Sequence, residues 1–137
     1  MRLDVAFDEV LPHPIEAVWA ELTDADAISD WLMKTSDFKP VIGSRFRMKT
    51  EDLSSTGWVE AGVLELEPPH RMVWSWSGHD GNPPSTVTFD LTQEGKGTRL
   101  RLTHVGEMNA EVARILRDGW PGRIAAMADA IRRVGDG

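Results

Sequence analysis

His104 is the residue of this 137-residue chain whose type and position most directly suggest chemistry. It follows Leu100 and Leu102 on one side of a predicted strand, so its imidazole should point into the apolar interior. An imidazole there could hydrogen-bond a carbonyl or hydroxyl group of a ligand, or act as a general acid or base. The alternative is a structural histidine bonded to a neighbouring backbone group or indole, the commoner role for a single buried imidazole. We therefore treat His104 as a candidate catalytic and ligand-binding residue, weighed against that structural role.

A catalytic role would require a second polar group beside His104. Glu9 and Glu60 are the candidates, because each shares the parity of apolar residues in its own predicted strand. A carboxyl group buried beside the imidazole would have a shifted pKa and would mark a site. Each glutamate is more simply explained as a strand residue that faces water. Nothing in the sequence forces the three side chains together.

Six tryptophans stand in a chain that has no tyrosine and no cysteine. Trp74 and Trp76 alternate within one predicted strand, whereas Trp31 and Trp120 close two helical patterns. Each indole can bury roughly 150–250 Å² and carries an N–H donor that needs a partner when buried. This arrangement indicates either the wall of an apolar cavity or an unusually aromatic core. Trp19 belongs to a helical stripe and is expected to be structural.

Residue spacing disfavours several other kinds of site. The histidines lack a second ligand at helical or strand spacing, so no metal is expected at His13, His70, His79 or His104. The glycines form no phosphate-cradling loop between a strand and a helix, which argues against nucleotide binding. The absence of cysteine excludes disulfides, thiolate catalysis, iron–sulfur clusters and cysteine-ligated zinc. No cofactor is therefore predicted.

Composition limits the partners of the chain. The formal net charge of −7, without a dense run of Lys and Arg, argues against nucleic acid as a partner. No stretch approaches the roughly 18 apolar residues of a membrane span, and the first residues lack a signal-peptide core, so a cytoplasmic location is expected. The length fits a single domain over residues 1–137. Composition does not determine the oligomeric state, so a monomer and a homodimer are both considered.

The elements that must position these residues follow from hydrophobic periodicity. Alternation predicts a strand over residues 2–10, and an apolar stripe at i, i+3, i+4 and i+7 predicts a helix over residues 15–22. A second short helix should then carry Trp31. Thr23 and Asp24 are both suitable residues to cap its first turn.

The second half of the chain predicts a sheet followed by one long helix. Five strands in an antiparallel meander are expected between residues 38 and 105, although residues 58–66 carry apolar side chains on both faces. The polar segment 77–84 is expected to be a solvated hairpin loop or a lid over a cavity mouth. A helix over residues 109–134 should cross the sheet, and Pro121 predicts a kink or a division into two helices.

This order of elements resembles the helix-grip fold of the START and Bet v 1-like superfamily, also called SRPBCC. The resemblance implies an α+β fold with a curved antiparallel sheet of about six strands, in the order β-α-α-β-β-β-β-β-α, wrapped around a long C-terminal helix. Within that superfamily the chain is similar to the subfamily named after the activator of Hsp90 ATPase. The signatures, in order, are Pro14-Ile15-Glu16-Ala17-Val18-Trp19, Leu22-Thr23-Asp24, Ile28-Ser29-Asp30-Trp31, Val41-Ile42-Gly43, Glu67-Pro68-Pro69-His70-Arg71, Val73-Trp74-Ser75-Trp76, Gly97-Thr98-Arg99-Leu100, Thr103-His104 and Gly119-Trp120.

The resemblance also implies a cavity between the sheet and the long helix. Alternation along the strands gives the same set of inward residues. The expected ligand-binding residues are Phe46, Met48, Trp74, Trp76, Phe89, Leu91, Leu102 and His104 on the sheet, Leu116, Trp120 and Met127 on the helix, and Trp31 at one end.

The function implied by the resemblance is broader than the fold, because members include lipid carriers, polyketide cyclases and hormone receptors. We expect a non-catalytic module that binds a small hydrophobic or amphipathic molecule, such as a lipid, in this cavity. One alternative is a cyclase, hydrolase or isomerase that uses His104. Another is an Hsp90-type chaperone cofactor that acts by protein interaction. The eukaryotic co-chaperones carry a separate N-terminal domain that this sequence lacks, so the Hsp90-activating role does not transfer with the name.

Overall fold

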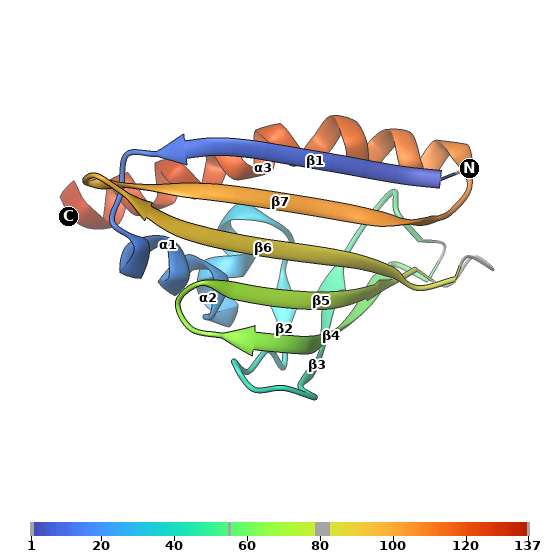
Figure 1. The fold of residues 1–137 in the computed structure, drawn as a ribbon. Helices are drawn as coiled ribbons and strands as arrows, with labels where there is room; N and C mark the ends of the chain where they lie inside the picture. Colours follow the sequence, from blue (N-terminus) through green and yellow to red (C-terminus); the bar gives the residue numbers. More distant parts are fainter. Residues whose placement is uncertain (1, 55, 79–82, 137) are drawn as a thin grey trace.

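The computed structural model describes residues 2–54, 56–78 and 83–136. One antiparallel sheet packs against three helices in an α+β arrangement, which confirms the expected helix-grip fold (Figure 1). In chain order the elements are β1 (Arg2–Leu11), α1 (Ile15–Leu22), α2 (Ala25–Trp31), β2 (Thr35–Ser36), β3 (Arg45–Lys49), β4 (Trp58–Glu67), β5 (Arg71–Ser77), β6 (Ser85–Glu94), β7 (Gly97–Glu107) and α3 (Ala110–Asp136). The sheet holds one more strand than the sequence predicts, because β2 spans two residues and leaves no detectable alternation.

The first and last strands lie side by side within the sheet, whose order is β1-β7-β6-β5-β4-β3-β2. β1 pairs with β7 along its whole length, beginning with Arg2 opposite Glu107. On the outer face, the Arg99 guanidinium donates to the Asp8 carboxylate at 2.9 Å across this pair. Figure 1 shows α3 running along the inner side of these strands, with α1 and α2 near its C-terminal end. The helices therefore cover one face of the sheet.

Side-chain caps set where two helices begin. The Asp24 carboxylate accepts a hydrogen bond from the Ala27 backbone N–H at 3.0 Å, which is the N-cap interaction of α2. Of the two caps considered from the sequence, the structure thus uses the aspartate. The Asn109 side-chain oxygen accepts from the Val112 backbone N–H at 2.9 Å at the start of α3. These caps satisfy donors that the first turn of a helix leaves unpaired.

α3 continues through Pro121 as one helix of 27 residues, so the alternative of two separate helices is wrong. Pro121 lacks a backbone donor, which removes one hydrogen bond from the helix. Trp120 and Ile124 beside it are each 1% exposed, and their burial on the inner face stabilises the continuous helix. Tertiary packing outweighs the local cost of the proline.

The ambiguous faces of residues 58–66 result from a β-bulge in β4. Val59 and Val63 point inward and are buried. The pairing with β5 then shifts register between Val63 and Glu65, so Leu64 faces outward with 51% of its surface exposed. After the bulge Leu66 packs against the core again. Before the bulge the odd-numbered residues of β4 face inward, and after it the even-numbered residues do. For this reason apolar residues occur at both odd and even positions of the strand.

Two glycines give a matched test of this packing. A Cβ at Gly106 in β7 would lie 2.5 Å from the Cβ of Ser85, whereas a Cβ at Gly122 in α3 would meet nothing within 4 Å. We expect Gly106→Ala to lower the free energy of unfolding by about 1–3 kcal/mol, because the backbone must move. Gly122→Ala should raise it by about 0.5–1 kcal/mol, because alanine favours the helix. Urea unfolding measures both; a neutral Gly106→Ala would contradict this close approach.

Candidate functional site

The residues expected to line a cavity come together in the interior between the sheet and α3. All twelve are buried, with exposed fractions between 0% and 5%. They are Trp31, Phe46, Met48, Trp74, Trp76, Phe89, Leu91, Leu102, His104, Leu116, Trp120 and Met127. A side chain without accessible surface touches neither bulk water nor an internal space large enough for water. The interior is therefore filled around the residues at 0%, which include Trp74, Phe89 and Met127.

Aromatic rings supply much of that filling. Trp74 lies at the centre, with its ring centroid 4.8 Å from that of Phe89 and 5.1 Å from that of Phe46, both at steep angles. Trp76 and Trp120 approach to 5.9 Å and link β5 to α3. Edge-to-face packing of this kind is favourable beyond the apolar area that it buries. The tryptophans are thus first of all a packed aromatic core.

His104 is fully buried at the junction of the sheet and α3, and both of its ring nitrogens are hydrogen-bonded. Its Nδ1 atom lies 3.1 Å from the Trp120 indole nitrogen, and its Nε2 atom lies 2.8 Å from the Ser85 hydroxyl oxygen. The Ser85 hydroxyl also lies 3.2 Å from the backbone oxygen of Trp76. One chain of hydrogen bonds therefore joins α3, β7, β6 and β5.

The chemistry of the partners fixes the direction of this chain. An indole nitrogen can only donate, so Nδ1 of His104 accepts from Trp120 and the ring proton resides on Nε2. Nε2 then donates to the Ser85 oxygen, and the Ser85 hydroxyl donates to the Trp76 carbonyl. Each of the three donated hydrogens, from the Trp120 indole, the His104 imidazole and the Ser85 hydroxyl, therefore has one acceptor. The neutral imidazole is the only protonation state that satisfies all three bonds.

Burial lowers the pKa of His104 to about 3. The cause is desolvation, which disfavours the charged imidazolium. At neutral pH His104 is uncharged, and its acceptor nitrogen is already occupied by Trp120. This geometry matches the structural role considered for His104 more closely than the role of a general base.

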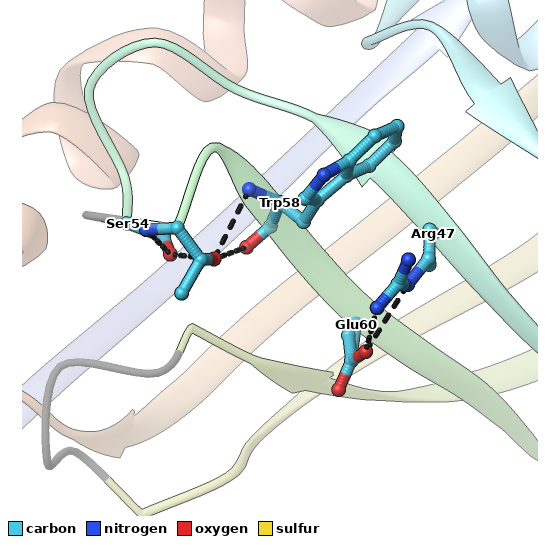
Figure 2. Close-up of polar contacts among 5 residues, drawn as sticks. Arg47, Ser54, Trp58 and Glu60 are labelled. Atoms are coloured by element: carbon cyan, nitrogen blue, oxygen red, sulfur yellow. Dashed lines mark hydrogen bonds and ion pairs between the residues drawn. The ribbon is translucent and has the colours of Figure 1, made fainter.

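The carboxylates considered as partners of His104 lie elsewhere. Glu9 is exposed and stands opposite Leu100 on β7. Figure 2 shows Glu60 on the outer side of β4, where it accepts from the Arg47 guanidinium at 3.0 Å. That guanidinium lies 5.4 Å from the centre of the Trp58 ring. Both glutamates thus have the water-facing position that the sequence analysis gave as the simpler explanation, and neither adjoins His104.

Ser85 is the polar partner that sequence reasoning missed. Ser85 directly follows Pro84, the last residue of the polar segment 77–84, where no alternation is apparent. The strand β6 begins at Ser85, which shares the inward parity of Val87. Extending the alternation by one step would have placed this hydroxyl inside.

A small internal space remains at one end of the interior, next to this hydrogen-bond chain. It has a volume of about 20 Å³, and Trp76 and Ser85 form part of its wall. Its full lining is Leu53, Trp76, Gly78, Pro83, Ser85, Met108, Val112 and Leu116. A space of this size holds about one water molecule. The segment expected to act as a loop or lid adjoins it, but residues 79–82 lie outside the described residues.

A larger hollow of about 500 Å³ lies on the outer face of the sheet. Arg45 and Arg47 border it on β3, and Gly62 and Ser75 border it on the next two strands. Of the twelve expected ligand-binding residues, only Phe46 is part of its lining. This hollow is open to solvent, and Phe46 is the one aromatic residue of the core that borders it.

Within the described ranges, no group of three His, Cys, Asp or Glu side chains is arranged to hold a metal ion. None of the described helices is both long enough and apolar enough to cross a membrane. Trp74 Nε1 is the one fully buried side-chain nitrogen or oxygen, among the described residues, that has no hydrogen-bond partner.

Comparison with known proteins finds the same fold elsewhere. The family model described as activator of Hsp90 ATPase homolog 1-like protein matches residues 12–132. Protein MLL2253 from Mesorhizobium loti superposes with a TM-score of 0.82 and is 30% identical, covering 95% of this chain and 97% of that chain. No match is found among the curated proteins.

Two other solved structures are also similar. CalU16 from Micromonospora echinospora has a TM-score of 0.76 and 25% identity, covering 93% of this chain and 75% of that one. Protein CV1439 from Chromobacterium violaceum has a TM-score of 0.81 and covers 93% of this chain and 96% of that chain. Its identity of 22% supports the shared fold alone.

The buried imidazole predicts how stability depends on pH. The folded-state pKa of His104, about 3, lies below its ordinary value of 6.5, so the unfolded chain binds a proton first as the pH falls. Its contribution to stability is therefore complete above the unfolded pKa and is lost as the pH falls toward the folded pKa. From about pH 7.5 to 5.5 this residue alone should lower the free energy of unfolding by about 1.4 kcal/mol.

Urea unfolding of wild type and His104→Gln at the two pH values measures this contribution. The variant should be less stable but should show a correspondingly weaker pH dependence. His13→Gln is the matched control, since it removes a half-exposed imidazole outside the hydrogen-bond chain. Equal pH dependence of wild type and His104→Gln would show that His104 is not held neutral by the fold; His104→Asn repeats the test if the glutamine variant does not fold.

Proposed function

The chain belongs to the activator of Hsp90 ATPase homolog 1-like family, and from that premise we propose that it is a non-catalytic binding module for a small hydrophobic or amphipathic molecule. The proposed site is the end of the interior beside Trp76 and Ser85. The observation that carries the proposal is the residual space there, which adjoins both an indole and a hydroxyl. Ligand sites commonly combine apolar walls with a few polar groups that orient the ligand.

The interior must rearrange to admit such a ligand, because the space holds about 20 Å³. Leu53 and Met108 border it, and both belong to connections between elements, the first between β3 and β4 and the second between β7 and α3. They are 4% and 6% exposed, so both side chains are buried in the wall of the space. Methionine is unbranched and has three rotatable bonds, so it changes conformation at low cost. We assign the opening to these two side chains.

Ser85 supplies the polar contact in this proposal. Its hydroxyl hydrogen is donated to the Trp76 carbonyl, while its oxygen accepts from His104. A hydroxyl oxygen has two lone pairs, so one acceptor position remains for an O–H or N–H group of a ligand. His104 and Trp120 then act as positioning residues that orient Ser85. This arrangement favours an amphipathic ligand with one hydrogen-bond donor.

The catalytic alternative receives less support from the same geometry. His104 would have to break its bond from Trp120 before it could accept a proton, and its pKa of about 3 makes it a weak base at neutral pH. Glu9 and Glu60 are not positioned to assist it. Binding without turnover is the function that the described residues support best.

Removing the cover of the space tests the proposal, with 1-naphthol as an apolar probe that carries one O–H donor. Met108→Ala should increase its affinity by at least about threefold, because the binding-competent state no longer requires the methionine to move. Met33→Ala is the matched control, since Met33 is also buried but does not line the space. Isothermal titration calorimetry gives the affinities.

Intrinsic fluorescence locates the bound probe in the same experiment. Trp76→Phe should remove most of the quenching caused by 1-naphthol, whereas Trp19→Phe on α1 should preserve it, because Trp19 does not line the space. Similar affinities for wild type and Met108→Ala, or quenching that survives in Trp76→Phe, would contradict binding at this end of the interior.

A further inference from the structure

A third pocket, separate from the aromatic interior, lies where the end of α1, all of α2 and the C-terminal part of α3 meet. Its volume is about 440 Å³. Four carboxyl groups and one guanidinium belong to its lining, which consists of Glu21, Asp24, Asp26, Ala27, Asp30, Ala130 and Arg133. Figure 1 shows α1 and the C-terminal end of α3 on the same side of the molecule. The pocket therefore concentrates negative charge at one place on the fold.

Glu21 distinguishes this pocket from an ordinary acidic surface. It is only 8% exposed, and no described residue donates a hydrogen bond to its side chain. Its backbone carbonyl accepts from the Trp31 indole at 2.9 Å, which fixes the main chain at this position. A buried charged group without a partner is costly, so buried carboxylates are normally paired. No described side chain donates a hydrogen bond to the Glu21 carboxylate, whose oxygens keep the small contact with solvent that its 8% exposure allows.

The electrostatic surroundings of Glu21 indicate the charge of a group that would pair with it. Burial raises the pKa of Glu21, and the neighbouring carboxylates of Asp30 and Asp24 raise it further. Arg133 on α3 opposes them, but it lies on an exposed stretch and forms no ion pair with a described carboxylate. A cation placed in the pocket would neutralise this repulsion and stabilise the ionised form of Glu21.

The arrangement of the carboxylates favours a molecular cation over a metal ion. Within the described residues, no three acidic side chains approach closely enough to hold a metal. Ala27 and Ala130 add apolar surface between the charges. An alkyl ammonium combines N–H donors with a hydrocarbon chain, and it can contact several carboxylates that are too far apart for one metal ion.

We propose that this pocket binds an organic ammonium ion, of the alkylamine or polyamine class, with the Glu21 carboxylate as the buried acceptor. The Asp26 and Asp30 carboxylates on α2 contribute further attraction, and Asp24 is already engaged in capping that helix. The site is independent of the interior site near Trp76, since the two pockets share no lining residue.

Titration with spermidine, followed by backbone amide NMR shifts, tests the proposal. The shifts should concentrate at Ala27, Asp30 and Ala130, which line the pocket. Glu21→Gln should weaken spermidine binding about tenfold, because it removes the buried acceptor of a charge-assisted hydrogen bond. Asp30→Asn should weaken it less. n-Butylamine, with one ammonium group, should bind at the same residues with lower affinity.

Glu16→Gln is the matched control, because Glu16 is an exposed residue of the same helix and its loss changes the net charge equally. It should alter the affinity less than twofold. Glu21→Gln should also melt at a higher temperature than wild type, since the fold no longer buries an unpaired carboxylate. Weaker binding by a more stable variant cannot result from unfolding.

Three results would overturn the proposal. The first is equal weakening by Glu16→Gln and Glu21→Gln, which would indicate attraction to the overall negative charge. The second is a set of shifts spread over acidic surfaces rather than the pocket. The third is displacement of spermidine by an equal concentration of MgCl₂ in a low-salt buffer, which would indicate a site for small inorganic cations.

Discussion

The structure depends on keeping one buried imidazole neutral and fully hydrogen-bonded. His104 receives the Trp120 indole proton on one nitrogen and donates from the other to Ser85, which in turn bonds the Trp76 backbone. An unpaired polar group in this position would cost more than any one of these bonds gains. The chain of bonds therefore fixes α3 against the sheet at a defined position, within a contact surface that is otherwise apolar and offers little directional preference.

The same arrangement explains why a fold associated with cavities has a filled interior here. Trp74 packs against Phe46 and Phe89, while Trp76 and Trp120 meet beside the imidazole, so large rings occupy the space that smaller side chains would leave open. Indole rings that fill the interior bury a large apolar surface and make the core close-packed and rigid. This filling also restricts the residual internal space to one end of the core, where Leu53 and Met108 are part of the lining.

The sequence predicted the architecture and the inward faces because both follow from residue periodicity, which one chain displays in full. It did not predict the bulge after Val63, although the apolar residues at both odd and even positions of β4 result from that bulge. The partner of His104 was missed because Ser85 stands at a strand boundary, where alternation is weakest. Filling of the interior and the pocket around Glu21 depend on how three helices and a sheet pack together, so no single segment encodes them.

The pairing of β1 with β7 also has a consequence for the order of events during synthesis. Asp8 and Arg99, which bond across these strands, are separated by 91 positions in the chain. At translation rates of about 5–20 residues per second, the first strand is synthesised roughly 5–20 s before its partner. Throughout that interval its apolar side chains have no sheet to join. The β1–β7 pair is thus a late event in folding during synthesis, since it cannot form before residues 97–107 have been made.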